Sequence, residues 1–135
     1  MHRVDSRRRV IAAIALAVVV ATGLAVHTLL ADSAATDIAG DALYAIAAYL
    51  FVVLVAPRLS PVVTGAVAAA WCVAVELFQL TGIPLSLGAV FSPAMLVLGT
   101  VFDARDLVVY IVAVGVTTMT DAAIRARGNR RRQAR

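Results

Sequence analysis

Long apolar runs are the feature that most limits what this chain can fold into. Apolar residues make up 62% of the 135 residues, and only 15% of the residues are charged. Soluble domains contain about 45–50% apolar and about 25% charged residues. A short chain leaves a large share of its surface outside, so it cannot bury this many apolar side chains in its own core. The sequence therefore predicts an integral membrane protein with one domain, residues 1–135.

Four of the apolar runs have the length of a transmembrane helix, which needs about 20 residues. They are residues 10–31, 40–56, 61–80 and 106–124. Pro57 ends the second run, because proline has no N–H with which to continue the hydrogen-bond ladder of a helix. The first run exceeds the apolar region of a signal peptide, about 7–15 residues, and is therefore expected to remain as a helix.

A fifth apolar segment, residues 85–102, has two interpretations. It is 18 residues long, the lower limit for a spanning helix, and Gly88, Ser92-Pro93 and Gly99 interrupt it. Two short helices joined at Ser92-Pro93 would form a re-entrant hairpin, which is tolerated where protein covers the broken backbone. Otherwise the segment crosses the membrane as a short fifth helix.

The arginine distribution favours the first interpretation. All twelve basic residues are Arg, and they gather in the two tails, residues 1–9 and 125–135, with Arg58 and Arg105 between them. Four crossings place both tails and Arg58 on one side, as the positive-inside rule requires. We therefore expect an all-α bundle of four transmembrane helices plus a Pro-broken re-entrant hairpin, in the inner membrane of a bacterial cell. Both tails should then lie in the cytoplasm and contact membrane lipids, not nucleic acid.

Carboxylates cluster at one depth of this predicted topology. Asp41, Glu76, Asp103 and Asp106 all fall in the outer third of the membrane, and hydrogen-bonding side chains follow them at helical spacing. A carboxylate inside a membrane is costly and is by default a functional hypothesis. Helix capping is an equal alternative for Asp41, Asp103 and Asp37. The candidate site residues are Asp41, Tyr44, Glu76, Gln79, Asp103, Asp106 and Tyr110.

Signatures of enzymes and metal sites are absent from the sequence. There is no HExxH, GxSxG or phosphate-binding loop, and the lone Cys72 excludes an intrachain disulfide and a Cys-based metal site. We therefore expect no metal, cofactor or catalytic residue. An intramembrane hydrolase or transferase with carboxylates as acid and base is a weaker alternative.

An ordered set of short motifs resembles a known family. The motifs are residues 40–44 (GDALY), 57–60 (PRLS), 76–80 (ELFQL) and 96–99 (LVLG), then Phe102, Asp106-Leu107, Tyr110 and Gly115. They resemble the uncharacterised bacterial membrane family numbered 2809 among the domains of unknown function. More distantly they are similar to VanZ-like proteins, some of which are linked to resistance to the glycopeptide teicoplanin.

One element departs from that family's pattern. The resemblance implies an Arg-x-Thr element before the leucine-glycine segment, but residues 88–93 read GAVFSP and contain no Arg. If that Arg neutralises the membrane acids in the family, its role here falls to Arg105 or to bound cations or protons. Otherwise the activity is lost.

Three functions fit these observations. The first is a non-enzymatic cell-envelope protein whose acidic cluster binds a polar or cationic ligand, such as a lipid headgroup or a lipid-linked cell-wall precursor. The second is transport of protons or a small solute through Glu76, for which a homo-oligomer would have to enclose the path. The third is a structural subunit of a membrane complex.

Overall fold

The computed structural model describes residues 2–99 and 101–133, with the side chains of residues 6–99, 101–130 and 133. Over these ranges the chain forms six α-helices and no strand, which confirms the predicted all-α class. The helices are α1 (His2–Leu29), α2 (Ala34–Val55), α3 (Pro61–Gln79), α4 (Ile83–Val90), α5 (Pro93–Leu98) and α6 (Ala104–Gln133).

Four of these helices are long and apolar enough to cross a membrane. The candidate spans are Ser6–Leu29, Ala34–Val55, Pro61–Gln79 and Ala104–Arg130. α4 has 8 residues and α5 has 6, so neither can cross the hydrocarbon core. The described part of residues 85–102 thus forms two short helices separated at Phe91 and Ser92, where the sequence places the break. The protein is therefore a membrane-embedded helical bundle with four long helices.

Local capping explains where α2 and α3 begin. α2 starts at Ala34, six residues before the Gly40 expected from the apolar pattern, because Ser33 and Thr36 cap it reciprocally through side-chain and backbone hydrogen bonds. α3 starts where expected, with the Ser60 hydroxyl accepting from the N–H of Val63 and with Pro61 in the first turn. Residues 34–39 are consequently helix, and the turn between α1 and α2 is short.

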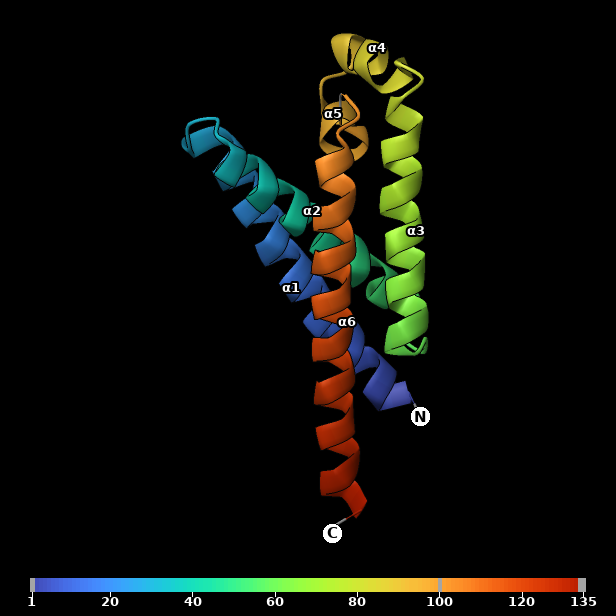
Figure 1. Ribbon diagram of the computed structural model, residues 1–135. Helices are drawn as coiled ribbons and strands as arrows, with labels where there is room; N and C mark the ends of the chain where they lie inside the picture. The colour runs from blue at the N-terminus through green and yellow to red at the C-terminus, as the bar shows by residue number, and fades with distance from the viewer. Residues whose placement is uncertain (1, 100, 134–135) are drawn as a thin grey trace.

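The long helices pack in pairs (Figure 1). α1 packs on α2, α2 also contacts α3 and α6, and α3 packs along α6. α4 and α5 pack on each other and on the end of α3. The buried core consists of small and aromatic side chains: Ala12, Ala45, Tyr49, Val53, Ala68, Cys72, Tyr110 and Val114. Most other apolar side chains point outward, as lipid-facing side chains do.

Gly65 lies where α3 and α6 approach each other closely. A Cβ added to this glycine would collide with the hydroxyl oxygen of Thr118 in α6. The sequence pairs Gly65 with Ala69 as a small-residue motif, and such motifs let helix backbones approach closely in membranes. This contact therefore sets the separation of the two helices that carry Glu76 and Asp106.

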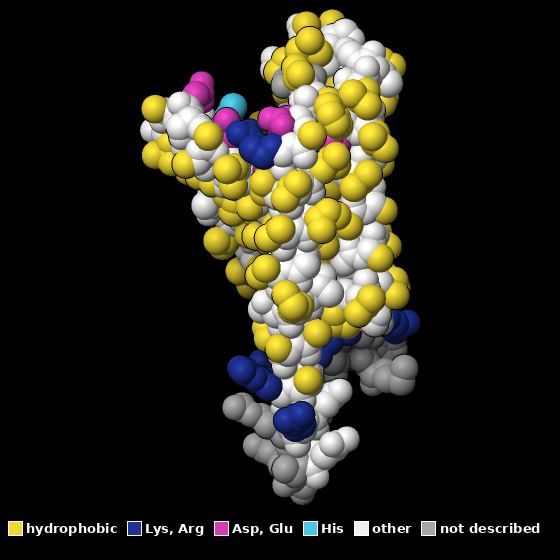
Figure 2. All heavy atoms as spheres, viewed as in Figure 1, with side chains coloured by type: hydrophobic (Ala, Val, Ile, Leu, Met, Phe, Trp, Pro, Cys, Tyr) yellow, Lys and Arg dark blue, Asp and Glu magenta, His cyan; other side chains and the backbone are white. Residues whose placement is uncertain are grey.

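The two ends of the bundle carry opposite charge (Figure 2). An apolar belt separates an end with Arg side chains, here the basic end, from one with Asp and Glu side chains. The basic end carries Arg8, Arg9 and Arg125, which bond to residues 55–59, and Arg58. The other end, here the acidic end, carries Asp37, Asp41, Glu76, Asp103 and Asp106 together with Arg105.

A network around Asp121 holds the basic end together. Its carboxylate pairs with Arg8 at 2.8 Å and with Arg125 at 3.3 Å, and it accepts a hydrogen bond from the Tyr49 hydroxyl at 2.9 Å. Arg125 also donates to the Leu59 carbonyl at 2.9 Å, and Arg8 donates to the Pro57 carbonyl. This network thereby ties α1, the α2–α3 loop and α6 together.

Candidate carboxylate site at the acidic end

Glu76 is the most deeply placed acid of the acidic end. It lies in the last turn of α3, and its side chain is completely buried, with 0% exposure. One carboxyl oxygen, Oε1, accepts a hydrogen bond from the backbone N–H of Asp103 at 2.6 Å. The other oxygen, Oε2, is buried and has no hydrogen-bond partner among the described residues. A buried acceptor without a partner costs about 1–3 kcal/mol, so it calls for an explanation.

Asp41 of α2 and Asp106 of α6 face each other. Their carboxyl groups lie within side-chain hydrogen-bonding reach, and Glu76 is close enough to interact electrostatically with both. Asp106 Oδ1 is also buried and makes no hydrogen bond in the described part of the chain, but it lies 3.6 Å from the Arg105 guanidinium. Three helices therefore bring one carboxyl each to the same place, as their shared predicted depth implied.

Arg105 neutralises the more exposed acids. Its guanidinium lies 3.5 Å from Asp103, 3.6 Å from Asp106 and 3.8 Å from Asp37, and its side chain is 41% exposed. Arg105 was one candidate to replace the Arg that the family pattern implies, and bound cations or protons were the other. Arg105 thus reaches only part of the cluster. Neither Asp41 nor Glu76 has an ion pair within the described ranges.

Gln79 and Tyr44 fasten α5 beside the carboxyl groups. Gln79 Nε2 donates to the Leu98 carbonyl at 2.8 Å, and the Tyr44 hydroxyl donates to the Val97 carbonyl at 2.7 Å. Both acceptors are orphan carbonyls of the C-terminal end of α5, which no helical N–H satisfies. The remaining amide oxygen of Gln79, Oε1, is buried without a partner among the described residues.

Asp103 and Tyr110 occupy different surroundings. Asp103 precedes α6, and its carboxylate accepts from the backbone N–H of Arg105 at 2.8 Å, as a helix cap does. Its side chain is 48% exposed, so only its backbone N–H reaches Glu76. Tyr110 is buried in α6, and its ring centre lies 5.9 Å from that of Tyr44. Of the seven candidate residues, Asp103 is thus the one whose side chain points away from the buried cluster.

Two contributors were missed in the sequence. Trp71 donates its indole N–H to the Tyr44 hydroxyl at 3.0 Å and so orients it. Gly99 has φ +63°, and a Cβ there would collide with Gln79 Nε2. The role of Trp71 could not be predicted, because no helical spacing connects it with Tyr44. Gly99 could have been found, because a glycine after an apolar run that ends at Leu98 is typical of the end of a helix.

The described residues contain no group of three or more His, Cys, Asp or Glu side chains that could hold a metal ion. The arrangement instead offers buried oxygen acceptors to hydrogen-bond donors. A protonated amine or a proton has the complementary charge and chemistry.

Comparison with known proteins assigns the family. No curated protein and no solved structure matches the chain. A family model described as "Protein of unknown function (DUF2809)" matches residues 30–115, which include all seven candidate site residues. Because this match covers more than half of the 135 residues, the chain belongs to that uncharacterised family.

Proposed function

We propose that this membrane protein binds a ligand with a protonated amine at its acidic end. The observation that carries the proposal is the buried Glu76 Oε2, which has no hydrogen-bond partner in the described part of the chain. Gln79 Oε1 shares that property, and Asp106 Oδ1 makes no hydrogen bond, with the Arg105 guanidinium 3.6 Å away. An ammonium group has three N–H donors and a positive charge, and it would satisfy acceptors of this kind.

The charge balance supports a cationic ligand. The described acidic end carries the carboxyl groups of Asp37, Asp41, Glu76, Asp103 and Asp106, and Arg105 pairs with three of them. Interhelical hydrogen bonds in membranes contribute on average about 0.6 kcal/mol, a small return for placing acids in a bilayer. A ligand drawn from the membrane, such as an amine-bearing lipid headgroup or a lipid-linked cell-wall precursor, would reach this end directly.

Lipid binding in nanodiscs tests the proposal. Phosphatidylethanolamine carries three N–H donors, whereas phosphatidylcholine carries none, so the wild-type protein is expected to retain the former preferentially. Glu76→Gln and Asp106→Asn should each weaken phosphatidylethanolamine retention about tenfold or more, because each removes a charge-assisted hydrogen bond.

Asp37→Asn is the matched control. It makes the same charge change as Asp106→Asn on a side chain that is 54% exposed, and it should leave retention unchanged. Equal binding of both lipids, or full retention by the Glu76 and Asp106 variants, would overturn the proposal.

Growth on teicoplanin with and without the same variants tests whether the remote VanZ-like similarity extends to a resistance phenotype.

The contact between Asp41 and Asp106 favours proton transport as a second candidate. Two neighbouring carboxylates repel each other when both are charged, so a proton or a cation between them would stabilise the pair. Glu76 beside it would extend the relay, and a homo-oligomer would have to enclose the path. Proteoliposomes that show no Glu76-dependent proton flux would exclude this candidate. Copurification of a stoichiometric partner would instead favour a structural subunit.

A further inference from the structure

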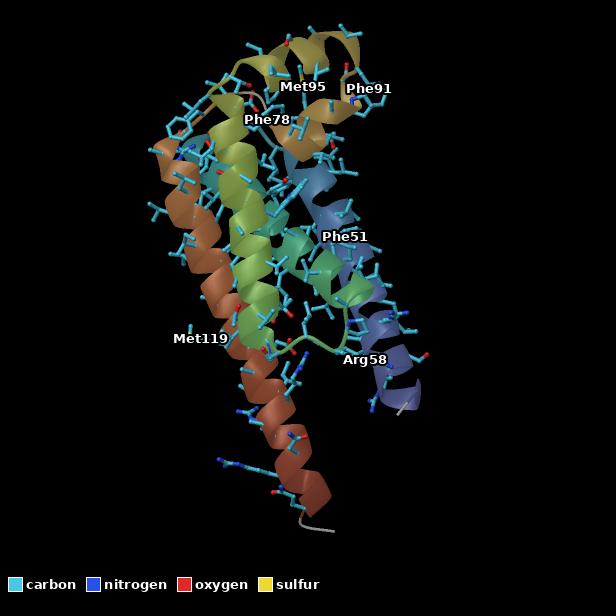
Figure 3. The ribbon with its side chains drawn as sticks, turned by 90° about the vertical axis from the view of Figure 1, so that its right-hand side faces the viewer. Phe51, Arg58, Phe78, Phe91, Met95 and Met119 are labelled. Carbon is cyan, nitrogen blue, oxygen red and sulfur yellow. The ribbon has the colours of Figure 1, made fainter. Side chains whose placement is uncertain are left out.

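The opposite, basic end of the bundle contains a second candidate site. A cavity of about 640 Å³ opens between the start of the α1 span and the junction of α2 with the α2–α3 loop. This volume lies in the range of small-ligand sites, about 300–1,000 Å³. Its polar lining comes from Ser6, Arg9 and Arg58, and its apolar lining includes Val10, Val55 and Leu59. Figure 3 places Arg58 in that loop, beside the first turns of α1.

The cavity lies at one end of the apolar belt. The apolar run of α1 begins at Val10, directly after Arg9, and α2 ends at Val55, so both mark the level at which the apolar belt gives way to polar surface. Val10 is 54% exposed and Val55 is 60% exposed, so the apolar wall of the cavity continues onto the lipid-facing surface. A ligand in this cavity would therefore have its polar part near the arginines and its apolar part in the bilayer.

The charged side chains among the described residues that line the cavity are both positive, those of Arg9 and Arg58. Arg9 makes one hydrogen bond in the described part of the chain, a long one of 3.4 Å to the Val55 carbonyl. The planar guanidinium group carries five donors whose geometry matches phosphate oxygens, so most of the donors of Arg9 remain for a ligand.

We propose that this cavity binds the phosphate group of an anionic phospholipid. The guanidinium groups of Arg9 and Arg58 and the Ser6 hydroxyl would contact the phosphate, while Val10, Val55 and Leu59 would contact the glycerol and the first methylenes. A free phosphate ion shares the polar part of this chemistry but has nothing to place against the apolar wall. The lipid, and not the free ion, is therefore the proposed ligand.

Native mass spectrometry of the whole protein with phosphatidylglycerol and phosphatidylcholine tests the site. The wild-type protein should retain phosphatidylglycerol preferentially. The double variant Arg9→Gln/Arg58→Gln should lose about 30-fold in phosphatidylglycerol affinity, the value expected for removing two arginines near an anionic lipid surface. Arg127→Gln/Arg130→Gln removes the same charge from exposed positions of α6 that do not line the cavity, and it should change affinity less than threefold.

Two further measurements separate the explanations. Ser6→Phe fills the cavity from an exposed position without changing the charge, and it should also reduce phosphatidylglycerol retention, with helix content checked by circular dichroism. Inorganic phosphate at millimolar concentration should not displace the lipid. Displacement by phosphate would reassign the cavity to the free ion. Equal losses in the two double variants, or retention by both Ser6→Phe and the Arg9/Arg58 variant, would overturn the proposal.

Discussion

The carboxyl group of Glu76 accepts a hydrogen bond from the backbone N–H of Asp103 at 2.6 Å, across 27 residues of sequence. This bond joins the end of α3 to the residue before α6, and it orients the carboxyl so that its second oxygen stays buried without a partner among the described residues. The two oxygens of one carboxyl group thus have separate roles. Oε1 maintains the fold, and we assign Oε2 to a ligand.

Substitutions at Glu76 should separate these two properties. Glu76→Ala leaves the Asp103 N–H without its acceptor and is expected to destabilise the protein by about 1–3 kcal/mol. Glu76→Gln keeps an oxygen for that N–H, so most of the stability should be retained while the negative charge is lost. Thermal unfolding in a fixed detergent measures both. Equal destabilisation by Ala and Gln would mean that the charge, and not the hydrogen bond, maintains the fold.

Gly99→Ala should release α5 from the site. The substitution requires a strained left-handed backbone at φ +63° and also pushes a methyl group into Gln79 Nε2. Gly82→Ala is the matched control, because Gly82 has φ +70° with nothing within 4 Å of an added Cβ. Both variants carry backbone strain, about 1–2 kcal/mol in the αL conformation of Gly82 and more at Gly99, whose ψ of −161° is essentially restricted to glycine. Only Gly99→Ala should increase hydrogen exchange in residues 93–98. Similar exchange in the two variants would contradict the Gln79 contact.

Gly65→Val should separate α3 from α6. The added side chain collides with Thr118, and overpacking of this kind typically costs about 1–3 kcal/mol. Gly115→Ala tests the same pair of helices at a position with open space, since nothing lies within 4 Å of its added Cβ, and it should be neutral or slightly stabilising. Thr118→Ala combined with Gly65→Ala should recover much of the stability lost in Gly65→Ala alone. Unfolding followed by circular dichroism measures all four variants.

Cysteine labelling tests the orientation in the membrane. In a Cys72→Ser background, Ser33→Cys places a thiol in the α1–α2 turn, and Ser60→Cys places one in the α2–α3 loop; both positions are exposed. The arginine distribution leads us to expect that an impermeant maleimide labels Ser33→Cys in intact cells, and Ser60→Cys only after lysis. The reverse pattern would place the acidic end in the cytoplasm.

Much of the architecture follows from the sequence alone. Hydropathy over windows of about 20 residues determines which segments can cross a membrane, and proline at positions 57 and 93 determines where helices must stop or restart. Helical periodicity determines that Glu76 shares a face with Gln79, and Asp41 with Tyr44. These features depend on a few neighbouring residues, so no knowledge of the packing was needed to predict them.

Only the tertiary structure decided how those faces meet. Periodicity fixes angles within one helix, but the rotation of one helix against another depends on side-chain packing, as at Gly65 and Thr118. Packing turned Asp41 toward Asp106, and it placed the backbone N–H of Asp103, not the Asp103 carboxylate, beside Glu76. It also brought Tyr44 and Gln79 to the carbonyls of α5. The sequence therefore determined a membrane bundle with acids at one depth, and the packing of its helices decided which of their oxygens were left without a partner.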